Sequence, residues 1–156
     1  EQSFAVDNIG IKINGTEDIT QIKDSDVIVI TAGVARKPGM SRDDLIEVNF
    51  SIISQIGNAI KKYSPNAFVI CVTNPLDAMT WSLKKVANIK KNKIVGMAGI
   101  LDSARFKYFL SKKINVSMEC IQTMVLGGHG DTMVPLLRYT SISGIQIEEF
   151  IKKKKN

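Results

Sequence analysis

The sequence predicts an α/β fold built on a doubly wound parallel sheet, and three observations support this prediction. Short apolar runs rich in β-branched residues alternate with longer stretches of helical periodicity. The longest of these runs are nearly continuous rather than alternating in polarity, which is typical of parallel strands covered on both faces. Polar and glycine-rich segments directly follow several runs, where ligands bind in sheets of this kind.

Four runs are predicted to form strands of the sheet. They are residues 9–13, which end at an Asn-Gly turn, and residues 26–32, 68–73 and 93–97. Beyond Ser117 the pattern changes, because two β-rich segments flank a cluster of glycines. We expect these segments, residues 121–126 and 134–140, to begin an antiparallel second subdomain.

Helices are predicted between the strands. Ser41 and Asp44 have the spacing of a capping box, and a Pro-Gly turn precedes them. Apolar residues then recur every three or four positions, which predicts one long amphipathic helix ending near Tyr63. Residues 76–86 and 101–113 are predicted to form two further helices. This alternation of strands and helices indicates βαβ units.

Composition and charge exclude several classes of protein. The chain has 156 residues, 44% of them hydrophobic, which excludes a wholly disordered chain. No apolar run approaches the ~20 residues of a membrane span. Four of the six excess positive charges lie in Lys152 to Lys155, where no aromatic residues interleave. This pattern favours a solvated helix end over a nucleic-acid site.

Cysteine and histidine content bears on compartment and metal binding. Cys71 and Cys120 both lie in apolar runs, which favours buried thiols in a reducing compartment over disulfides. The chain opens on Glu1 without a basic and then apolar leader, so we expect no signal peptide and a cytoplasmic location. With one histidine and no Cys/His cluster, no metal site is predicted.

Charged side chains gather in the segments that follow the predicted strands. Arg36 and Arg42 follow the first long run, and Asn74 follows the next. Asp102 and Arg105 follow the third, and His129 stands among glycines in the last of these segments. Because the carboxyl ends of parallel strands share one edge, we expect several of these groups to converge.

Each of these groups has two interpretations. Asp102 and Arg105 share a helix face and could form a local ion pair, or Asp102 could orient an imidazole while Arg105 binds a carboxylate. Arg36 and Arg42 could be solvated loop charges. His129 could be structural, but its flanking glycines permit tight backbone geometry, and a carboxylate-held imidazole is a suitable proton exchanger.

Four segments resemble malate dehydrogenases of the type most similar to lactate dehydrogenases. They are Thr-Ala-Gly-Val-Ala-Arg-Lys-Pro-Gly-Met-Ser-Arg at 31–42, Val-Thr-Asn-Pro-Leu-Asp at 72–77, Gly-Met-Ala-Gly-Ile-Leu-Asp-Ser-Ala-Arg-Phe at 96–106 and Gly-Gly-His-Gly-Asp-Thr-Met-Val-Pro at 127–135. The resemblance covers about residues 9–150, with the motifs in the family's order and spacing. It implies the reversible, NAD-dependent oxidation of malate to oxaloacetate.

The resemblance also implies roles for single residues. His129 resembles the base that takes the hydroxyl proton, and Asp102 the carboxylate that orients it. Arg42 resembles the residue that polarises the reacting oxygen when its loop closes. Arg105 and Arg36 resemble the residues that bind the two carboxylates of the dicarboxylate substrate.

Other matching positions resemble substrate and cofactor contacts. Asn74 resembles a hydrogen-bonding partner of the substrate, and its bond to Pro75 is expected to be cis. The residues that resemble contacts of NAD are Thr31, Ala32, Gly33, Asn49, Val72, Thr73 and Asn74.

The chain departs from the family at its start, where no Gly-x-Gly-x-x-Gly is found. We therefore expect an internal fragment with a partial Rossmann-type sheet that lacks its first βαβ unit. Residues 1–100 would be part of the NAD-binding domain, and residues 101–156 the start of an α+β substrate domain. The strand at 26–32 would then present an unpaired apolar edge, and the chain alone would bind NAD poorly and be inactive.

Two alternatives to a malate dehydrogenase remain open. One is a lactate-type 2-hydroxy acid dehydrogenase, which Arg36 disfavours. The other is a catalytically silent fragment or interaction chain that keeps the motifs without the cofactor half. The family also implies that the full-length parent forms a homodimer or homotetramer, with no nucleic-acid or membrane partner.

Overall fold

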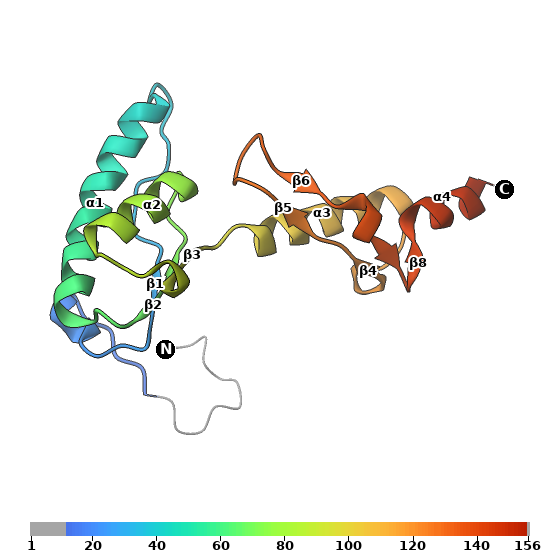
Figure 1. Ribbon diagram of the computed structural model, residues 1–156. Coiled ribbons are helices and arrows are strands. Elements are labelled where there is room, and N and C mark those ends of the chain that lie inside the picture. Colours follow the sequence, from blue (N-terminus) through green and yellow to red (C-terminus); the bar gives the residue numbers. More distant parts are fainter. Residues whose placement is uncertain (1–11, 156) are drawn as a thin grey trace.

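The computed structural model describes residues 12–155 and shows two lobes joined between β3 and α3 (Figure 1). The first lobe contains β1 (Val27–Ile30), β2 (Phe68–Cys71), β3 (Ile94–Gly96), α1 (Arg42–Tyr63) and α2 (Leu76–Val86). The second contains α3 (Gly99–Ile114), β4 (Ile121–Gln122), β5 (Val125–Leu126), β6 (Val134–Pro135), β7 (Ser141–Ile142), β8 (Ile145–Gln146) and α4 (Ile147–Lys155). Short 3₁₀ helices lie at Ile19–Ile22, Lys91–Lys93, Met118–Cys120 and Leu137–Tyr139.

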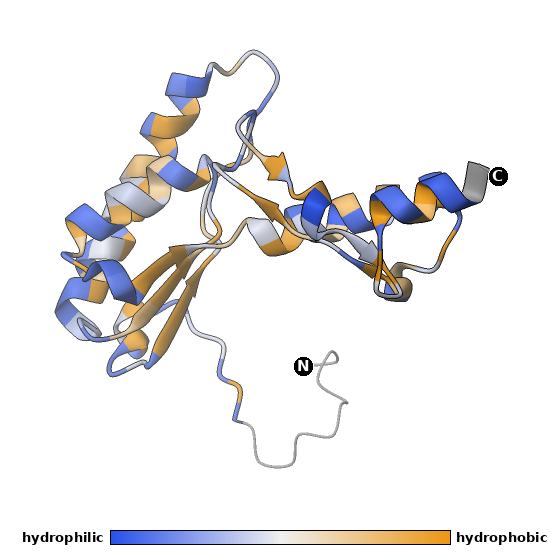
Figure 2. Ribbon diagram, turned by 45° about the vertical axis from the view of Figure 1, so that its right-hand side comes forward, coloured by the Kyte–Doolittle hydropathy of each residue, from blue (hydrophilic) through white to orange (hydrophobic). Residues whose placement is uncertain are grey.

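The first lobe is a parallel sheet in the order β1-β2-β3, which confirms the predicted α/β class. Successive right-handed crossovers in one direction place α1 and α2 on the same face of the sheet (Figure 2). The core between sheet and helices includes Ile53 of α1, Val69 of β2 and Met79 of α2, none of which is exposed to solvent.

The three strands are shorter than predicted. Residues 31–32 and 72–73 lie in the loops at the carboxyl edge, although the Val72 amide still donates to the Ile30 carbonyl, and Lys93 belongs to a 3₁₀ helix. Most of the strand predicted at 9–13 lies outside the described residues, and Lys12 and Ile13 are not in a strand.

The sheet face opposite the helices is open in the described part of the chain. Val27 and Val29 of β1 are 55% and 57% exposed, and Val95 of β3 is also exposed. Coverage of both faces, which the apolar runs predicted, is therefore not present within residues 12–155. Among those residues β1 pairs only with β2, so it forms the predicted open edge.

Side chains fix both ends of α1. Ser41 Oγ accepts from the Asp44 amide at 3.0 Å and Asp44 Oδ2 accepts from the Ser41 amide at 2.9 Å, which confirms the capping box. At the other end, Ser64 Oγ accepts from the Ser25 amide at 3.2 Å and donates to the Ile22 carbonyl. The capping box fixes the start of α1 locally, whereas the bonds of Ser64 join its end to the segment before β1.

The remaining helices agree closely with the sequence. α2 has the predicted bounds, and α3 begins two residues before the predicted start at Leu101 and ends at Ile114. Asn115 follows in the left-handed conformation that commonly ends helices. The lysine tail continues α4, where Lys153 pairs with Glu149 at 2.8 Å on an exposed surface, as predicted for a solvated helix end.

The second lobe is antiparallel, as expected, but its strands are short. β4, β7 and β8 form one sheet and β5 and β6 form a hairpin. Residues 134–140, predicted to be β-rich throughout, contain only the two residues of β6 and then a 3₁₀ turn. Pro135 has no amide to donate to a ladder, which limits strand extension at this point.

Other sequence expectations concern thiols, membrane spans and metals. Both cysteines are free, and Cys71 is buried, but Cys120 is only half-buried, so its prediction as a buried thiol is wrong. Within residues 12–155, no helix combines the length and apolarity needed to cross a membrane. In the same part of the chain, no cluster of three or more candidate metal ligands occurs.

Replacing Ser41 with alanine is expected to lower the free energy of unfolding by about 1 kcal/mol at neutral pH, the usual cost of losing a serine N-cap. The Ser41 hydroxyl and amide also lower the pKa of Asp44. A carboxyl with a depressed pKa stabilises the fold above its unfolded pKa, and this contribution disappears as the pH falls through the folded pKa. The loss of unfolding free energy in Ser41→Ala should therefore be smaller at acidic pH than at neutral pH.

Urea unfolding at neutral and acidic pH measures this difference. Ser51→Ala, an exposed position in the middle of α1, is the matched control. A Ser41→Ala deficit that stays constant into acid would show that Asp44 makes no pH-dependent contribution through this cap.

Candidate functional site

A buried carboxylate holds the only histidine of the sequence. Asp102 Oδ2 lies 2.9 Å from His129 Nδ1, and the Asp102 side chain is 7% exposed against 20% for His129. Asp102 lies in the first turn of α3, where its negative charge is favoured by the helix dipole. Because Nδ1 faces the carboxylate, Nε2 is the ring nitrogen left to exchange a proton with a ligand.

Arg105 is a weaker partner of the same carboxylate. Its Nη1 lies 3.9 Å from Asp102 Oδ1, and its side chain is 61% exposed. Screening by solvent makes such a contact weak, so the hydrogen bond to His129 dominates at Asp102. The guanidinium consequently remains exposed, on the other oxygen of the carboxylate that holds the imidazole.

Helix α3 also fixes the strand that leads to His129. The hydroxyl of Ser103 accepts a hydrogen bond from the Val125 amide at 2.9 Å, at the start of β5. A Cβ at Gly99 would lie 3.2 Å from the Val125 carbonyl oxygen, so the strand passes close to the helix. Asp102 and Ser103 thus hold the same hairpin at its loop and at its first strand.

The β5–β6 loop depends on glycine. Gly127 has a φ of +100°, and a Cβ there would lie 2.4 Å from the carbonyl oxygen of Thr132. A Cβ at Gly128 would lie 2.6 Å from Thr132 Oγ1 and 3.3 Å from Asp77 Oδ2 of α2. The loop can therefore turn against Thr132 and approach α2 only where side chains are absent.

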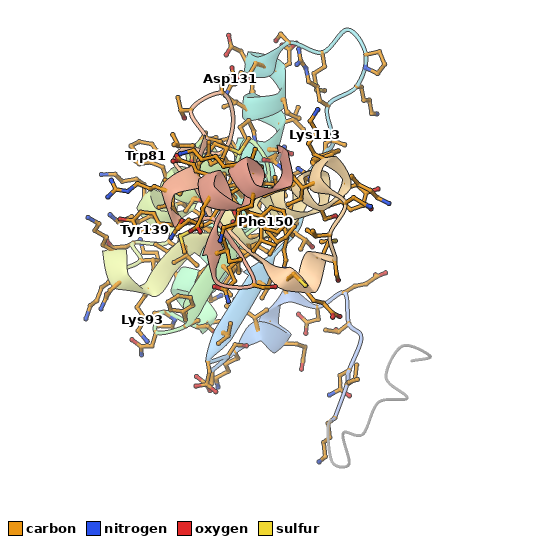
Figure 3. All side chains as sticks on the ribbon, turned by 90° about the vertical axis from the view of Figure 1, so that its right-hand side faces the viewer. Trp81, Lys93, Lys113, Asp131, Tyr139 and Phe150 are labelled. Carbon is orange, nitrogen blue, oxygen red and sulfur yellow. The ribbon has the colours of Figure 1, made fainter. Side chains whose placement is uncertain are left out.

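A cavity of about 510 Å³ opens beside the Asp102–His129 pair, between the two lobes. It is lined from α2 by Leu76, Asp77, Thr80, Trp81 and Lys84, and from the second lobe by Gly99, Asp102, Val125, Leu126, Gly127, His129 and Met133, with Lys91, Ile94, Gly96 and Ala98 between them. In Figure 3 Asp131 marks the tip of the β5–β6 loop and Trp81 the outer side of α2. His129 therefore faces a cavity that is lined by both polar and apolar side chains.

A second group of predicted residues meets at the carboxyl edge of the parallel sheet. Thr73 Oγ1 donates to the Ala32 carbonyl at 2.7 Å, which links the loops after β2 and β1. A Cβ at Gly33 would lie 2.6 Å from Thr73 Cγ2 and 3.2 Å from Asn49 Oδ1, so Gly33 packs closely between them. Thr31 and Ala32 are exposed beside this contact.

Asn49 of α1 joins the same group and is completely buried. Its amide hydrogen-bonds to the backbone of Val34 and Asn74, on the loops after β1 and β2. Val72 is half-buried, whereas Asn74 is exposed, and the Asn74–Pro75 bond is cis as expected. The structure thus brings together the residues from these two strand ends.

The two loop arginines lie apart from the other candidates. Arg36 and Arg42 are exposed, and no described interaction joins either of them to Asp102 or His129. Arg36 Nε donates to the Met40 carbonyl at 3.1 Å, which folds the loop back on itself. Figures 1 and 3 show this loop and the His129 loop at the same end of the molecule.

The structure adds residues to the site that the sequence did not single out. Ser103 lies within the Asp-Ser-Ala-Arg motif, but its bond to Val125 spans 22 positions. Val34, Asp77 and Thr132 contribute through the backbone or through close approach. Only the glycine pattern around His129 signalled any of these contacts in advance.

Gly127→Ala is expected to displace the His129 loop, because the left-handed φ costs about 1–3 kcal/mol for a side chain and the new Cβ meets the Thr132 carbonyl. The ¹⁵N spectrum of the histidine ring should lose the signature of an Nδ1 bonded to a carboxylate, and His129→Gln assigns the signal. Gly15→Ala, where a Cβ meets nothing within 4 Å, is the control. An unchanged ring spectrum in Gly127→Ala would show that the loop tolerates a side chain.

Two protein-family models match this chain, and solved structures share its fold. Residues 4–96 match the family model of the lactate/malate dehydrogenase NAD binding domain, and residues 100–156 match that of the alpha/beta C-terminal domain. Malate dehydrogenase from Cryptosporidium parvum is 46% identical with a TM-score of 0.87, over 94% of this chain and 47% of that chain. Malate dehydrogenase from Plasmodium falciparum is 48% identical with a TM-score of 0.83, over 91% and 45%.

Lactate dehydrogenase from Eimeria maxima with NADH and oxamate is equally similar. It is 47% identical with a TM-score of 0.85, over 98% of this chain and 46% of that chain. The chain thus spans about half the length of each of these structures. Malate and lactate dehydrogenases are thus similar to this chain at the same level of sequence identity.

Proposed function

This chain belongs to the lactate/malate dehydrogenase family, and on that premise we propose that it is part of an NAD-dependent enzyme that interconverts malate and oxaloacetate. The observation that carries the proposal is the 2.9 Å contact between the buried carboxylate of Asp102 and His129, with the Arg105 guanidinium beside it. His129 lines the cavity as the candidate proton exchanger, and Arg105, which contacts the same carboxylate of Asp102, is the candidate carboxylate-binding group.

Proton exchange in this proposal occurs at Nε2 of His129. The imidazole takes the hydroxyl proton of malate, and the negative charge of Asp102 stabilises the imidazolium that forms. Burial of Asp102 strengthens this interaction, since few water molecules screen it. In the reverse direction the same nitrogen returns the proton to the carbonyl oxygen of oxaloacetate.

Bound NAD would supply the hydride chemistry, as a nicotinamide accepts or donates hydride. The carboxyl edge of the parallel sheet fits this cofactor, because dinucleotides bind outside the carboxyl ends of such strands. Thr31, Ala32 and Gly33 are exposed there, and Val72, Thr73 and Asn74 lie on the adjoining strand end. Thr73 and Asn49 are exceptions, because both are buried at this edge.

Substrate binding uses the cationic side chains. Arg105 would bind the carboxylate next to the reacting carbon, and Arg36 the second carboxylate of the dicarboxylate. Arg42 would polarise the reacting oxygen after its loop moves toward His129, and Asn74 would hydrogen-bond the substrate. Paired guanidinium–carboxylate contacts are both strong and specific in geometry.

A lactate-type activity is the second candidate, since a lactate dehydrogenase is as similar to this chain as the malate dehydrogenases are. Arg36 favours the dicarboxylate, because a substrate with one carboxylate would leave this charge without a partner in a closed site. A catalytically silent chain is the third. In the whole protein, NADH oxidation with oxaloacetate and with pyruvate distinguishes the three by preference for either substrate or by absence of turnover.

The proposal also covers the domain division, the cellular location and the assembly of the protein. Residues 1–100 would belong to the NAD-binding domain and residues 101–156 to the substrate domain, a division supported by the change from parallel to antiparallel pairing. Free Cys71 and Cys120 support a cytoplasmic location. The whole protein would act as a homodimer or homotetramer.

Arg36→Gln is expected to lower kcat/KM for oxaloacetate by about 100-fold, because one substrate carboxylate loses its charged partner. The value for pyruvate should fall far less, so that the ratio of the two reports the role of Arg36. Lys37→Gln, the adjacent loop cation, is the control. Unchanged constants for oxaloacetate in Arg36→Gln would contradict this assignment.

Asp102→Asn is expected to lower kcat by about 100-fold or more, since an amide cannot stabilise the imidazolium of His129. Asp131→Asn removes an exposed carboxylate from the tip of the β5–β6 loop, which carries His129, and should leave kcat unchanged. Steady-state rates of both variants across a pH range provide the measurement. Activity of Asp102→Asn within threefold of the unmodified protein would exclude a role for this carboxylate in the reaction.

A further inference from the structure

Asn49 forms a three-way connection at the carboxyl edge of the sheet. Its Oδ1 accepts from the Val34 amide at 2.7 Å, and its Nδ2 donates to the Val34 carbonyl at 3.2 Å. The same Nδ2 donates to the Asn74 carbonyl at 2.6 Å. One side chain from α1 thus bonds the loops that carry two of the candidate substrate-binding residues, Arg36 and Asn74.

The hydrogen bonds of Asn49 leave little capacity for a ligand. A carboxamide has two N–H donors and one oxygen acceptor, and here both donors and the oxygen have backbone partners. The residue has no exposed surface. These two facts separate Asn49 from its exposed neighbours at the sheet edge, such as Ala32 and Asn74.

We propose that Asn49 is a positioning residue that fixes the spacing between Arg36 and Asn74 and so sets the preference for dicarboxylate over monocarboxylate substrates. The inference rests on the function proposed above, in which those two residues bind the substrate. It assigns Asn49 a role through the protein backbone, in place of the NAD contact that resemblance implied.

The loop between β1 and α1 shows why one bond set can have this effect. Its far end is fixed at Ser41 by the capping box. Its near end is fixed at Val34 by Asn49, and Arg36 follows only two residues later. Between these anchors the loop is exposed and is held by local bonds such as that from Arg36 Nε to the Met40 carbonyl.

The helix that carries Asn49 is rigid enough to act as a reference. Ile53, one turn further along α1, is fully buried in the core, and Ser64 anchors the end of the helix. A second link, from Thr73 to Ala32, joins the same two loops directly. Removal of Asn49 should therefore shift the Arg36 loop without unfolding the sheet.

Few other side chains satisfy these three backbone groups. Alanine would leave the Val34 amide and two carbonyls without partners in a buried space, which carries a desolvation penalty. Aspartate would keep an acceptor for the Val34 amide but would place its second oxygen against the Asn74 carbonyl. The two substitutions therefore remove different parts of the connection.

The test compares Asn49→Ala and Asn49→Asp with Ser64→Ala in the whole protein. Ser64 is a matched control because it also joins α1 to backbone groups of an adjoining segment, at the opposite edge of the sheet. The measured quantity is kcat/KM for oxaloacetate divided by kcat/KM for pyruvate. Any loss of folded enzyme cancels in this ratio, so a purely structural defect leaves it unchanged.

We expect the ratio to fall about tenfold in both Asn49 variants, comparable to the loss of one or two hydrogen bonds, and to remain unchanged in Ser64→Ala. Hydrogen exchange gives a second readout that needs no activity. The Val34 amide should exchange faster in Asn49→Ala but stay protected in Asn49→Asp, which retains its acceptor.

A ratio that stays within twofold in both Asn49 variants overturns the proposal, and so does a similar fall in Ser64→Ala. If the unmodified protein shows no preference for oxaloacetate, the proposed substrate is wrong. Hydrogen exchange of the Val34 amide then tests by itself whether Asn49 positions the loop. Unchanged exchange in Asn49→Ala would overturn that role as well. If Asn49→Ala does not fold, the ratio in Asn49→Asp decides.

Discussion

Backbone groups that leave a parallel sheet at its carboxyl edge lose their ladder partners and need new ones, and the candidate site depends on how this need is met. Thr73 supplies a partner for the Ala32 carbonyl, and Asn49 supplies partners for Val34 and Asn74. The polar side chains at this edge therefore hold the loops in place first. Only residues left exposed after this, such as Thr31 and Arg36, remain for ligands.

The second lobe meets a different requirement, the compensation of a buried charge. Asp102 is almost fully enclosed, and a carboxylate in that position is costly unless it is hydrogen-bonded and paired. Its contacts are graded, with His129 at 2.9 Å and the far more exposed Arg105 at 3.9 Å. Burial raises the free-energy cost of the Asp102 charge, and it also strengthens the hydrogen bond of Asp102 to the imidazole of His129. Positioning of His129 is thus linked to the stability of the first turn of α3.

The sequence predicted features that depend on local patterns and one distant contact, that of Asp102 with His129, but it missed others. The capping box at Ser41 and Asp44 and the bounds of α2 follow from short-range spacing, and the structure agrees with both. The burial of Asn49 arises from partners 15 and 25 positions away, which no local pattern indicates. Leu45 and Ile53, one turn away on either side, place Asn49 on the apolar face of α1, but this pattern does not show which groups it bonds.

The same distinction explains two other differences. The apolar run that contains Val27 and Val29 predicted a strand correctly, but coverage of its second face depends on what packs there, and residues 12–155 leave that face open. Residues 134–140 have the composition of a strand, yet Pro135 and the bond from Thr140 Oγ1 to the Leu136 carbonyl favour a turn. Composition predicted the type of segment, and hydrogen-bond partners decided its length.

Overall identity does not separate malate from lactate dehydrogenases, which are 46% and 47% identical to this chain, so we expect substrate preference to depend on particular positions rather than on the fold. The distribution of rigid and exposed residues fits that conclusion. Asp102 and His129 lie between a helix and a hairpin that hold them in one geometry, whatever the second substituent of the substrate is. Arg36 lies instead on an exposed loop anchored at its two ends. In the proposed function, a change of residue or of anchor there would alter the preferred substrate while the Asp102–His129 pair remains undisturbed.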